Sequence, residues 1–274
     1  MIVFKIEDCF YNLTFKSNDH DVIENIVTFF GAHKHINTSD SRTPIEIEFY
    51  IEQNADGEYI IHSTDIFQKC KSHSELLGVL LCLLYEKLPT ENFIYLHGGE
   101  VSKDESCIAI LAPSNGGKTT VVMGLLENGF SYRSDDIIPI CKTNNQSFCF
   151  PKPVFIRENS PYRQYSNTII ENDEYKRYVW LPNRIDYIPK KLTSIFLLNR
   201  DVQFVDISTI NILQGAEKIK SVLYNIYKVS NAQEAISYVA NLLRCTPVYR
   251  IDYFTTNQAV CLINQVVKNE RKCF

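Results

Sequence analysis

The sequence predicts an α/β fold, and three observations favour it. The apolar run at residues 107–111, typical of a buried strand, leads through a loop of small residues into an apolar-periodic helical segment at residues 121–126. Further apolar runs, at residues 148–156 and 193–200, alternate with helical or irregular stretches. With 274 residues, of which 45% are hydrophobic and 22% charged, the chain is long and apolar enough for a well-filled core.

The first part of the chain predicts a small α+β module over residues 1–88. Its expected elements are paired strands at residues 1–7 and 12–16, a short helix at 21–31 ended by Gly31, a hairpin at 44–63 with its turn at Asp56-Gly57, and a helix at 74–87. A Ser72-x-x-Glu75 capping pattern opens the last helix. The remaining residues, 89–274, are expected to form a second domain.

The most informative segment is residues 108–120, IAILAPSNGGKTT. Small residues let consecutive N–H groups turn inward around phosphate oxygens, and the following helix adds its positive N-terminal end. Lys118 supplies charge for the β and γ phosphates, while the Thr119 hydroxyl can hold Mg²⁺. The spacing follows GxxxxGK(S/T), except that Ala112 replaces the first glycine. We predict a loop that binds ATP and Mg²⁺ through Ser114, Asn115, Gly116, Gly117, Lys118, Thr119 and Thr120. A chance Gly-Gly-Lys turn is the alternative, and the matching strand and helix on either side disfavour it.

Two adjacent carboxylates, Asp135 and Asp136, follow the helix in the segment GFSYRSDDIIPI. A short strand is expected to end at this pair. One acid can hold the Mg²⁺ and the other can accept a proton from an attacking hydroxyl. Carboxylates this close repel, which makes one of them a better base near neutral pH. The alternative is that Asp-Asp simply caps a bend.

The ordered set LHGGEV, strand, APSNGGKTT and GFSYRSDDIIPI resembles the HPr kinase/phosphorylase family over about residues 95–140. It is most similar to the HPr kinase-related proteins encoded beside ribosomal peptide pathways, some of which are peptide serine kinases. The resemblance implies a P-loop-containing, HPr kinase-like (PEP carboxykinase-like) core. It also implies that Asp135 is the base, that Thr119 and Asp136 address the metal, and that His97 lies near the transferred phosphoryl group.

The resemblance therefore implies a kinase that uses ATP and Mg²⁺ to phosphorylate a Ser or Thr hydroxyl of a peptide or small protein, such as a ribosomal peptide precursor. Its catalytic residues would be Asp135, His97 and Lys118. The bifunctional family members carry an acidic residue where this chain has Thr120, so phosphorylase activity is not expected. Two alternatives stay open, a nucleotide-binding regulator that transfers no phosphate and a kinase of a free small molecule.

Several residues stay open between two interpretations. His97 is either a structural histidine or part of the site, and Glu100 is either a metal or substrate contact or simply exposed. Residues 158–189 predict a long loop that is either a cationic lid or a solvated surface segment; its cations are Lys176, Arg177 and Arg184, with Lys190 and Lys191 just beyond. Arg157 and Arg163 either approach a phosphate or are exposed. Residues 212–268 predict two helices, a strand at 247–254 and a final helix.

Bulk properties limit the partners and the compartment. The net charge of −4 does not favour nucleic acid. Nine cysteines without a CxxC pair predict reduced thiols rather than a disulfide or metal framework. The N-terminus lacks a signal-peptide pattern, and the longest apolar stretch, LLGVLLCLLY, is too short to span a bilayer. We expect a cytoplasmic enzyme without a membrane partner, and the resemblance suggests a homo-oligomer.

Overall fold

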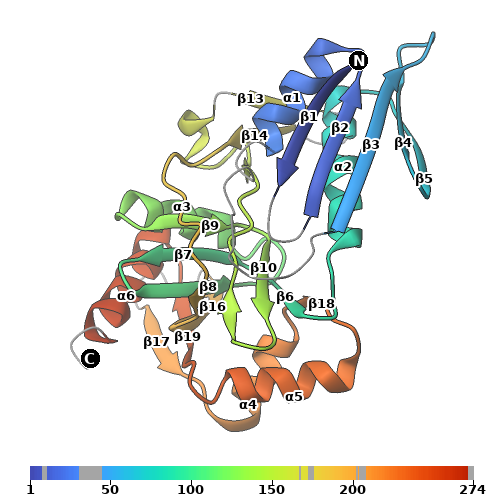
Figure 1. Ribbon diagram of the computed structural model, residues 1–274. Coiled ribbons are helices and arrows are strands. Elements are labelled where there is room, and N and C mark those ends of the chain that lie inside the picture. The colour runs from blue at the N-terminus through green and yellow to red at the C-terminus, as the bar shows by residue number, and fades with distance from the viewer. Residues whose placement is uncertain are drawn as a thin grey trace. The chain divides into compact units, whose positions relative to one another are not determined.

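A computed structural model describes residues 1–7, 11–30, 45–166, 168–171, 176–201, 203 and 208–270. The chain forms two compact units, which we call unit 1 (Met1–Pro89 and Lys152–Leu181) and unit 2 (Thr90–Pro151 and Pro182–Phe274). Each unit combines helices with β-sheets, so the predicted α/β class is confirmed (Figure 1). The division differs from the expected single boundary at residue 88, because Lys152–Leu181 groups with the N-terminal part.

Unit 1 contains a five-stranded sheet. Its strands, in sheet order, are β1 (Ile2–Glu7), β2 (Tyr11–Ser17), β3 (Ile45–Gln53), β4 (Tyr59–Ser63) and β5 (Ile66–Cys70). β2 and β3 are parallel and the other neighbours are antiparallel. The predicted strand pair and hairpin are confirmed, and Gly57 adopts the φ of +83° that the hairpin turn requires. The strand β5 was not predicted.

Two helices, α1 (His20–Phe30) and α2 (His73–Lys87), contact this sheet. Alternate strand residues are buried, and Phe15 stacks on both Phe30 of α1 and Phe49 of β3, with ring centroids 5.6 Å apart in each case. The predicted cap of α2 is confirmed, because the Ser72 hydroxyl accepts a hydrogen bond from the Glu75 N–H at 3.2 Å. The predicted helix end at Gly31 lies outside the described residues.

A second, three-stranded sheet completes unit 1, in the order β12 (Val154–Ile156), β14 (Lys176–Trp180) and β13 (Thr168–Glu171). A 3₁₀ turn, Arg163–Tyr165, precedes β13. The predicted strand at residues 148–156 is thus limited to Val154–Ile156, because Pro151 and Pro153 lack the N–H that a sheet needs. The ring centroids of Phe155 in β12 and Phe29 in α1 are 5.7 Å apart. This contact joins the three-stranded sheet to the N-terminal part of unit 1.

Unit 2 is built on a six-stranded sheet. Its strands, in sheet order, are β17 (Thr209–Ile212), β19 (Val248–Tyr253), β16 (Ser194–Arg200), β8 (Ser106–Leu111), β7 (Gly99–Lys103) and β9 (Ser131–Ser134). The three central strands β19, β16 and β8 are parallel. β7 is antiparallel to both β8 and β9, so β9 runs in the same direction as β8. The predicted strands at 107–111, 193–200 and 247–254 are confirmed.

A second sheet of unit 2 has the order β15 (Lys190–Lys191), β11 (Gln146–Ser147), β10 (Ile137–Cys141), β6 (Phe93–His97) and β18 (Ile226–Lys228). The helices are α3 (Lys118–Glu127), α4 (Gly215–Leu223), α5 (Ala232–Leu242) and α6 (Thr256–Glu270). One apolar core joins β6, β8 and β10 to α5, while α3 contacts α6, β7 and β8 (Figure 1). The two helices, the strand at 247–254 and the final helix predicted for the tail are confirmed, and the short strand β18 between α4 and α5 was not predicted.

No helix within the described ranges is both long and apolar enough to cross a membrane. The cysteines that the structure describes form no disulfide, and Cys70, Cys107, Cys141 and Cys149 are buried.

Candidate active site

The loop of small residues after β8 and the two adjacent acids after β9 lie at one edge of the six-stranded sheet. Because β8 and β9 run in the same direction, the loop after β8 and the acids after β9 both lie at carboxyl ends of strands. We call residues 112–117 the glycine loop. In open α/β sheets, ligands bind outside the carboxyl ends of the strands. The fold therefore places the glycine loop, Asp135 and Asp136 where a ligand site is expected.

The backbone of the glycine loop depends on residues that tolerate a left-handed conformation. Gly117 has a φ of +81° and Asn115 a φ of +65°. A Cβ added at Gly116 would lie 2.9 Å from the Ala112 Cβ and 2.9 Å from the Pro113 carbonyl oxygen. Gly117 is also the N-cap of α3 and has no side chain to cap its first turn. The positive end of α3 and the small loop are together suited to an anion.

Lys118, which directly follows the glycine loop, contacts another chain segment through His97. The Lys118 Nζ lies 2.7 Å from the His97 Nε2, and Lys118 is only 9% exposed. A lysine ammonium group can only donate hydrogen bonds, so the His97 Nε2 is the acceptor and carries no proton. His97 ends β6, and its N–H donates to the Asn225 carbonyl at 2.6 Å. The structure thus brings both residues to the edge where they were predicted to act.

Thr119 and Asp135 form the second contact, with the Thr119 hydroxyl donating to the Asp135 carboxylate at 2.9 Å. Asp135 is 2% exposed, whereas Asp136 is half-buried and its carbonyl accepts the Gly98 N–H at 3.0 Å. Thr119 and Asp136 were predicted to bind the metal, and Asp135 to accept the proton. The geometry instead joins Thr119 to the predicted base, Asp135, so the roles of the two acids stay a prediction.

Two glycines allow β7 to pass close to these groups. A Cβ at Gly99 would lie 2.5 Å from the Val122 Cγ2 of α3 and 3.7 Å from the Asp135 Oδ1. A Cβ at Gly98 would lie 2.5 Å from the Leu111 Cδ2. Gly99 therefore allows β7 to pack closely against α3 and Asp135, and Gly98 allows close packing against β8 and β10.

Glu100 is not exposed, contrary to one of the two interpretations of its role, and a metal or substrate contact stays a prediction. Its side chain is fully buried and pairs with the equally buried Arg133 of β9, with 3.3 Å between the Glu100 Oε1 and the Arg133 Nε. The Ser147 hydroxyl and the Cys107 thiol also donate to the Glu100 carboxylate. Burial raises the pKa of Cys107 well above its usual value, and the neighbouring Glu100 adds to this rise.

Arg133 connects the strand that carries Asp135 to the segment around Asp186. Its guanidinium donates to the Asp186, Ile188 and Ser147 carbonyls at 3.0, 2.6 and 3.1 Å. Burial by itself would lower the pKa of Arg133, but Glu100 and the other nearby acidic groups outweigh it and raise the pKa. Asp186 in turn accepts from Lys190 at 2.8 Å and from the Ser102 hydroxyl at 2.6 Å. This network holds Arg133 of β9 in place, two residues before Asp135 in the chain.

Replacing Arg133 with methionine is expected to lower the free energy of unfolding by about 3–5 kcal/mol, because it leaves the buried Glu100 carboxylate without its cation. Urea denaturation of the variant measures this loss. Arg184→Met is a matched control, since Arg184 is exposed and donates one hydrogen bond to the Gly129 carbonyl. The double variant Arg133→Met/Glu100→Gln should recover part of the loss. If it is as unstable as the single variant, the uncompensated charge is not the cause.

The segment at residues 158–189 is not one irregular loop as predicted, because it contains β13 and β14. It is also divided, with residues up to Leu181 in unit 1 and the rest in unit 2. In unit 2, Arg184 donates to the Gly129 carbonyl, Lys190 pairs with Asp186, and Lys191 is exposed. The side chains of Lys176 and Arg177 lie outside the described residues.

Arg157 and Arg163, for which the sequence left a phosphate contact open, both lie in unit 1. The Arg163 guanidinium lies over the Tyr178 ring, 4.6 Å from its centroid, and Arg157 is exposed. The lid hypothesis therefore stays a prediction.

Two residues at the candidate site were missed in the sequence. Arg200 ends β16 and Tyr253 ends β19, and both approach the glycine loop. Arg200 had a signal, because it is a cation directly after the apolar run of a predicted strand. Tyr253 had none, since an aromatic residue in a strand is ordinary.

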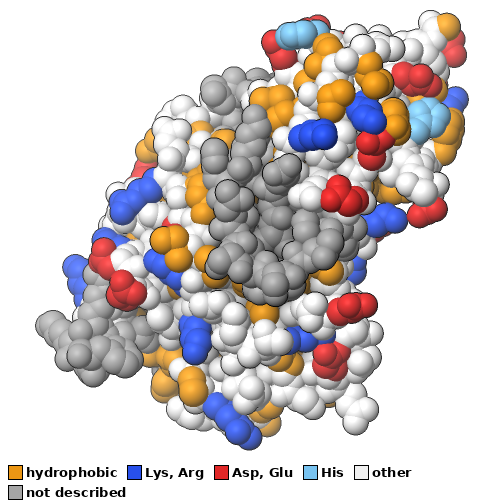
Figure 2. Space-filling view, in the orientation of Figure 1, with side chains coloured by type: hydrophobic (Ala, Val, Ile, Leu, Met, Phe, Trp, Pro, Cys, Tyr) orange, Lys and Arg blue, Asp and Glu red, His pale blue; other side chains and the backbone are white. Residues whose placement is uncertain are grey.

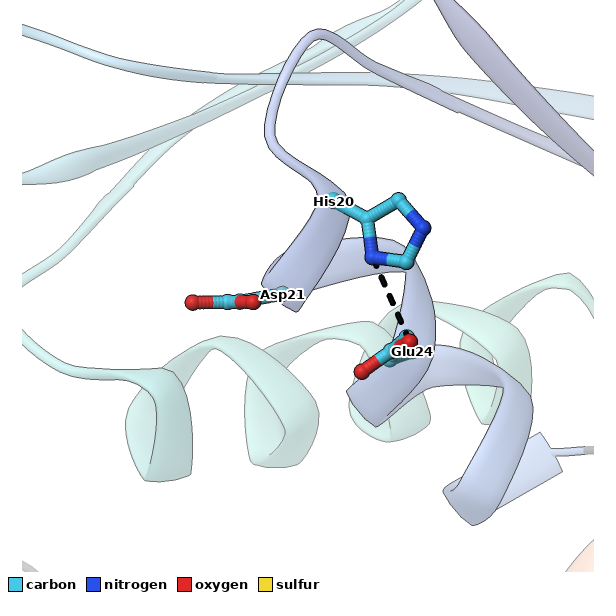
Figure 3. A group of neighbouring side chains, drawn as sticks. All are labelled: His20, Asp21 and Glu24. Atoms are coloured by element: carbon cyan, nitrogen blue, oxygen red, sulfur yellow. Dashed lines mark ion pairs between the residues drawn. The ribbon is translucent and has the colours of Figure 1, made fainter.

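Another cluster of potential metal ligands, His20, Asp21 and Glu24, lies at the start of α1 in unit 1 (Figure 3). The ligand atoms lie within 4.8 Å of one another, and the His20 Nδ1 pairs with a Glu24 oxygen at 3.3 Å. The His20 and Glu24 side chains are 71% and 68% exposed. Exposed acids are common in the first turn of a helix, where the dipole favours them, so the position in the helix accounts for this cluster without a metal.

Comparison with known proteins finds structural similarity but no match at the level of sequence. No family model matches the sequence, and no curated protein matches it. Among solved structures, the HPr(Ser) kinase/phosphatase from Coxiella burnetii matches with a TM-score of 0.35 and 14% identity, over 65% of this chain and 95% of that chain. Similarity at this level carries no conclusion about the chemistry of the site, which depends on the contacts given above.

Proposed function

We propose that the protein is a phosphotransferase that moves the terminal phosphoryl group of a nucleoside triphosphate to a hydroxyl group. One observation carries the proposal, namely that Lys118–His97 and Thr119–Asp135 meet at the end of the glycine loop. A cation, an imidazole, a hydroxyl and a carboxylate are the groups that phosphoryl transfer needs for charge stabilisation and for proton removal. Their convergence from three chain segments also supports the HPr kinase-like core implied by the sequence resemblance.

ATP fits the glycine loop. A Cβ at Gly116 or Gly117 would meet protein atoms at 2.9 Å or less, so the tight turn of the loop requires glycine at both positions. Backbone amides in such a turn are suited to phosphate oxygens. Lys118 begins α3 and would add its positive charge to that of the helix terminus. In this proposal the amides of residues 114–120 hold the phosphates, and Lys118 neutralises their charge.

Mg²⁺ fits the group of oxygen donors beside the loop. The Thr119 hydroxyl and the Asp135 and Asp136 carboxylates are the hard ligands that Mg²⁺ prefers, and Thr119 already contacts Asp135 at 2.9 Å. When bound, the ion would neutralise charge on the phosphates. We assign Thr119 and Asp136 to the ion and Asp135 to the proton of the accepting hydroxyl. The Thr119–Asp135 hydrogen bond supports the reverse assignment of the two acids, and the two assignments differ in their dependence on Mg²⁺.

The proposed acceptor is a Ser or Thr side chain of a peptide or small protein, with a ribosomal peptide precursor as the first candidate. The ordered motifs and their resemblance to peptide serine kinases support this choice. A nucleic-acid acceptor is not part of the proposal, because the net charge is −4 and Figure 2 shows acidic and basic side chains interspersed on the face drawn. The protein is further proposed to act as a homo-oligomer without a membrane partner.

Mass spectrometry of candidate acceptors tests the proposal. Ser-containing precursor peptides and HPr are incubated with the purified protein, ATP and Mg²⁺, and parallel reactions omit the Mg²⁺ or use heat-denatured protein. A gain of one phosphate on a Ser or Thr, lost in both controls, is the expected result. Measurable ATP binding without transfer to any acceptor would instead favour the nucleotide-binding regulator or a small-molecule acceptor.

A further inference from the structure

The strands β16 and β19 end beside the glycine loop. They are parallel, and their last residues, Arg200 and Tyr253, are direct neighbours in the sheet. The Asp201 N–H donates to the Tyr253 carbonyl at 3.0 Å, which extends the pairing beyond both strands. Since β8 also neighbours β16 in parallel, both residues reach the edge that carries the loop.

Tyr253 holds the backbone of the glycine loop from the side of β19. Its hydroxyl donates to the Gly116 carbonyl at 3.1 Å, and its side chain is 1% exposed. A Cβ at Gly117 would lie 2.6 Å from the same hydroxyl oxygen, so the contact extends over two loop residues. Burial raises the pKa of Tyr253 to about 12, against a smaller opposing effect of Arg200, so the phenol is a donor at neutral pH. This hydrogen bond fixes the direction of the Gly116–Gly117 peptide.

Arg200 lies beside Gly117. Its Cδ is 3.9 Å from the position of a Cβ there, and its Nε donates to the Phe254 carbonyl at 3.1 Å. This single bond anchors the stem of the guanidinium. No acid among the described residues forms an ion pair with Arg200, and its side chain is exposed. A guanidinium has five N–H donors, and those on its two terminal nitrogens have no acceptor within the described ranges.

We infer that the ends of β16 and β19 complete the phosphate site: Tyr253 is a positioning residue that sets the glycine loop, and Arg200 is a second cation that contacts the phosphates. This inference rests on the proposed nucleotide site. The two residues have different roles. Tyr253 acts through the loop backbone and touches no phosphate, whereas Arg200 acts by charge and by bidentate hydrogen bonds.

Equilibrium titration with ATP and with ADP, both with Mg²⁺, tests the inference on the full chain. Tyr253→Phe removes one hydrogen bond and should weaken ATP binding by about 3- to 10-fold. Arg200→Gln removes charge-assisted bonds and should weaken it by about 10- to 100-fold, with a smaller effect on ADP. Arg200→Gln should also reduce the dependence of ATP affinity on salt, an effect that a purely structural role would not produce.

Matched controls come from the same strands and the same unit. Tyr249→Phe removes a hydroxyl from β19 at a ring that stacks on Phe196, 5.3 Å away, and Arg244→Gln removes an exposed charge that precedes β19. Both should leave ATP affinity unchanged. Thermal unfolding without nucleotide identifies any variant that is less stable, and affinities are then measured well below its transition, where the protein is folded.

The outcomes separate this inference from the proposed function. If the wild type binds neither nucleotide, the proposed function is wrong and the inference with it. If the wild type binds ATP and Lys118→Ala does not, but Tyr253→Phe and Arg200→Gln bind like the wild type, the nucleotide site stands and the inference is overturned. If Arg200→Gln weakens ATP binding and Tyr253→Phe does not, only the role of Tyr253 is overturned.

Discussion

Replacing Lys118 with alanine is expected to abolish turnover and to weaken ATP binding by at least about 100-fold, equal to about 2.7 kcal/mol. Lys118 is the first residue of α3 and is almost buried, so its charge acts where water screens it little. A charge-assisted hydrogen bond to phosphate contributes more than a neutral one. Because the lysine would act in both the bound and the reacting complex, affinity and turnover should fall together.

The control for this experiment is Lys191→Ala, since Lys191 is exposed and precedes β16, at the end of the strand opposite to Arg200. It should bind ATP as the wild type does. Titration of both variants with ATP and Mg²⁺ measures the affinities. Normal ATP binding by Lys118→Ala would contradict the phosphate role of the glycine loop. In that case the contact between Lys118 and His97 would be a structural pair.

Local signals in the sequence account for the parts of the fold that could be predicted. The order of strand, glycine loop and helix follows from an apolar run, small residues and a new periodicity, all between Ser106 and Glu127. The end of α3 is also marked locally, by Asn128 at the C-cap and by Gly129 at a φ of +83°. Ser72 and Glu75 form their predicted cap because a cap depends only on residues of one turn.

Tertiary contacts explain what could not be predicted. No pattern in the sequence marks Arg133, and only the sheet order shows that Glu100 lies against it in the interior. An acid alone in a sequence has no visible partner, so exposure and ligand contact were the two natural interpretations of Glu100. Tyr253 meets Gly116 across 137 positions, a contact that no spacing pattern in the sequence encodes.

The division of residues 158–189 between the two units was missed for a related reason. Prolines and mixed charges in this segment are typical of a loop, and they concealed the short strands β13 and β14. Strands this short are stabilised by their neighbours in the sheet more than by their own sequence. β12 pairs with β14 in this way, and the two strands lie 20 or more positions apart in the chain.

Replacing Asp135 with asparagine is expected to reduce turnover by about 1,000-fold while ATP affinity changes by less than about 3-fold. Asparagine keeps the size of the side chain, and its carbonyl oxygen can still accept the Thr119 hydrogen bond, so the loop should stay in place. An amide cannot take the proton of an attacking hydroxyl. The loss should therefore appear in the chemical step, measured as single-turnover phosphate transfer with the enzyme in excess.

The Mg²⁺ dependence of two matched variants decides which acid is the base. If Asp135 is the base, excess Mg²⁺ will not restore Asp135→Asn, whereas Asp136→Asn will need more Mg²⁺ and will recover at high concentration. The opposite result, recovery of Asp135→Asn and a fixed loss in Asp136→Asn, would exchange the roles of the two acids. That exchange would agree with the 2.9 Å contact between Thr119 and Asp135, because the threonine hydroxyl and its neighbouring carboxylate would then serve the same ion. Near-normal turnover in both variants would leave neither acid as the proton acceptor.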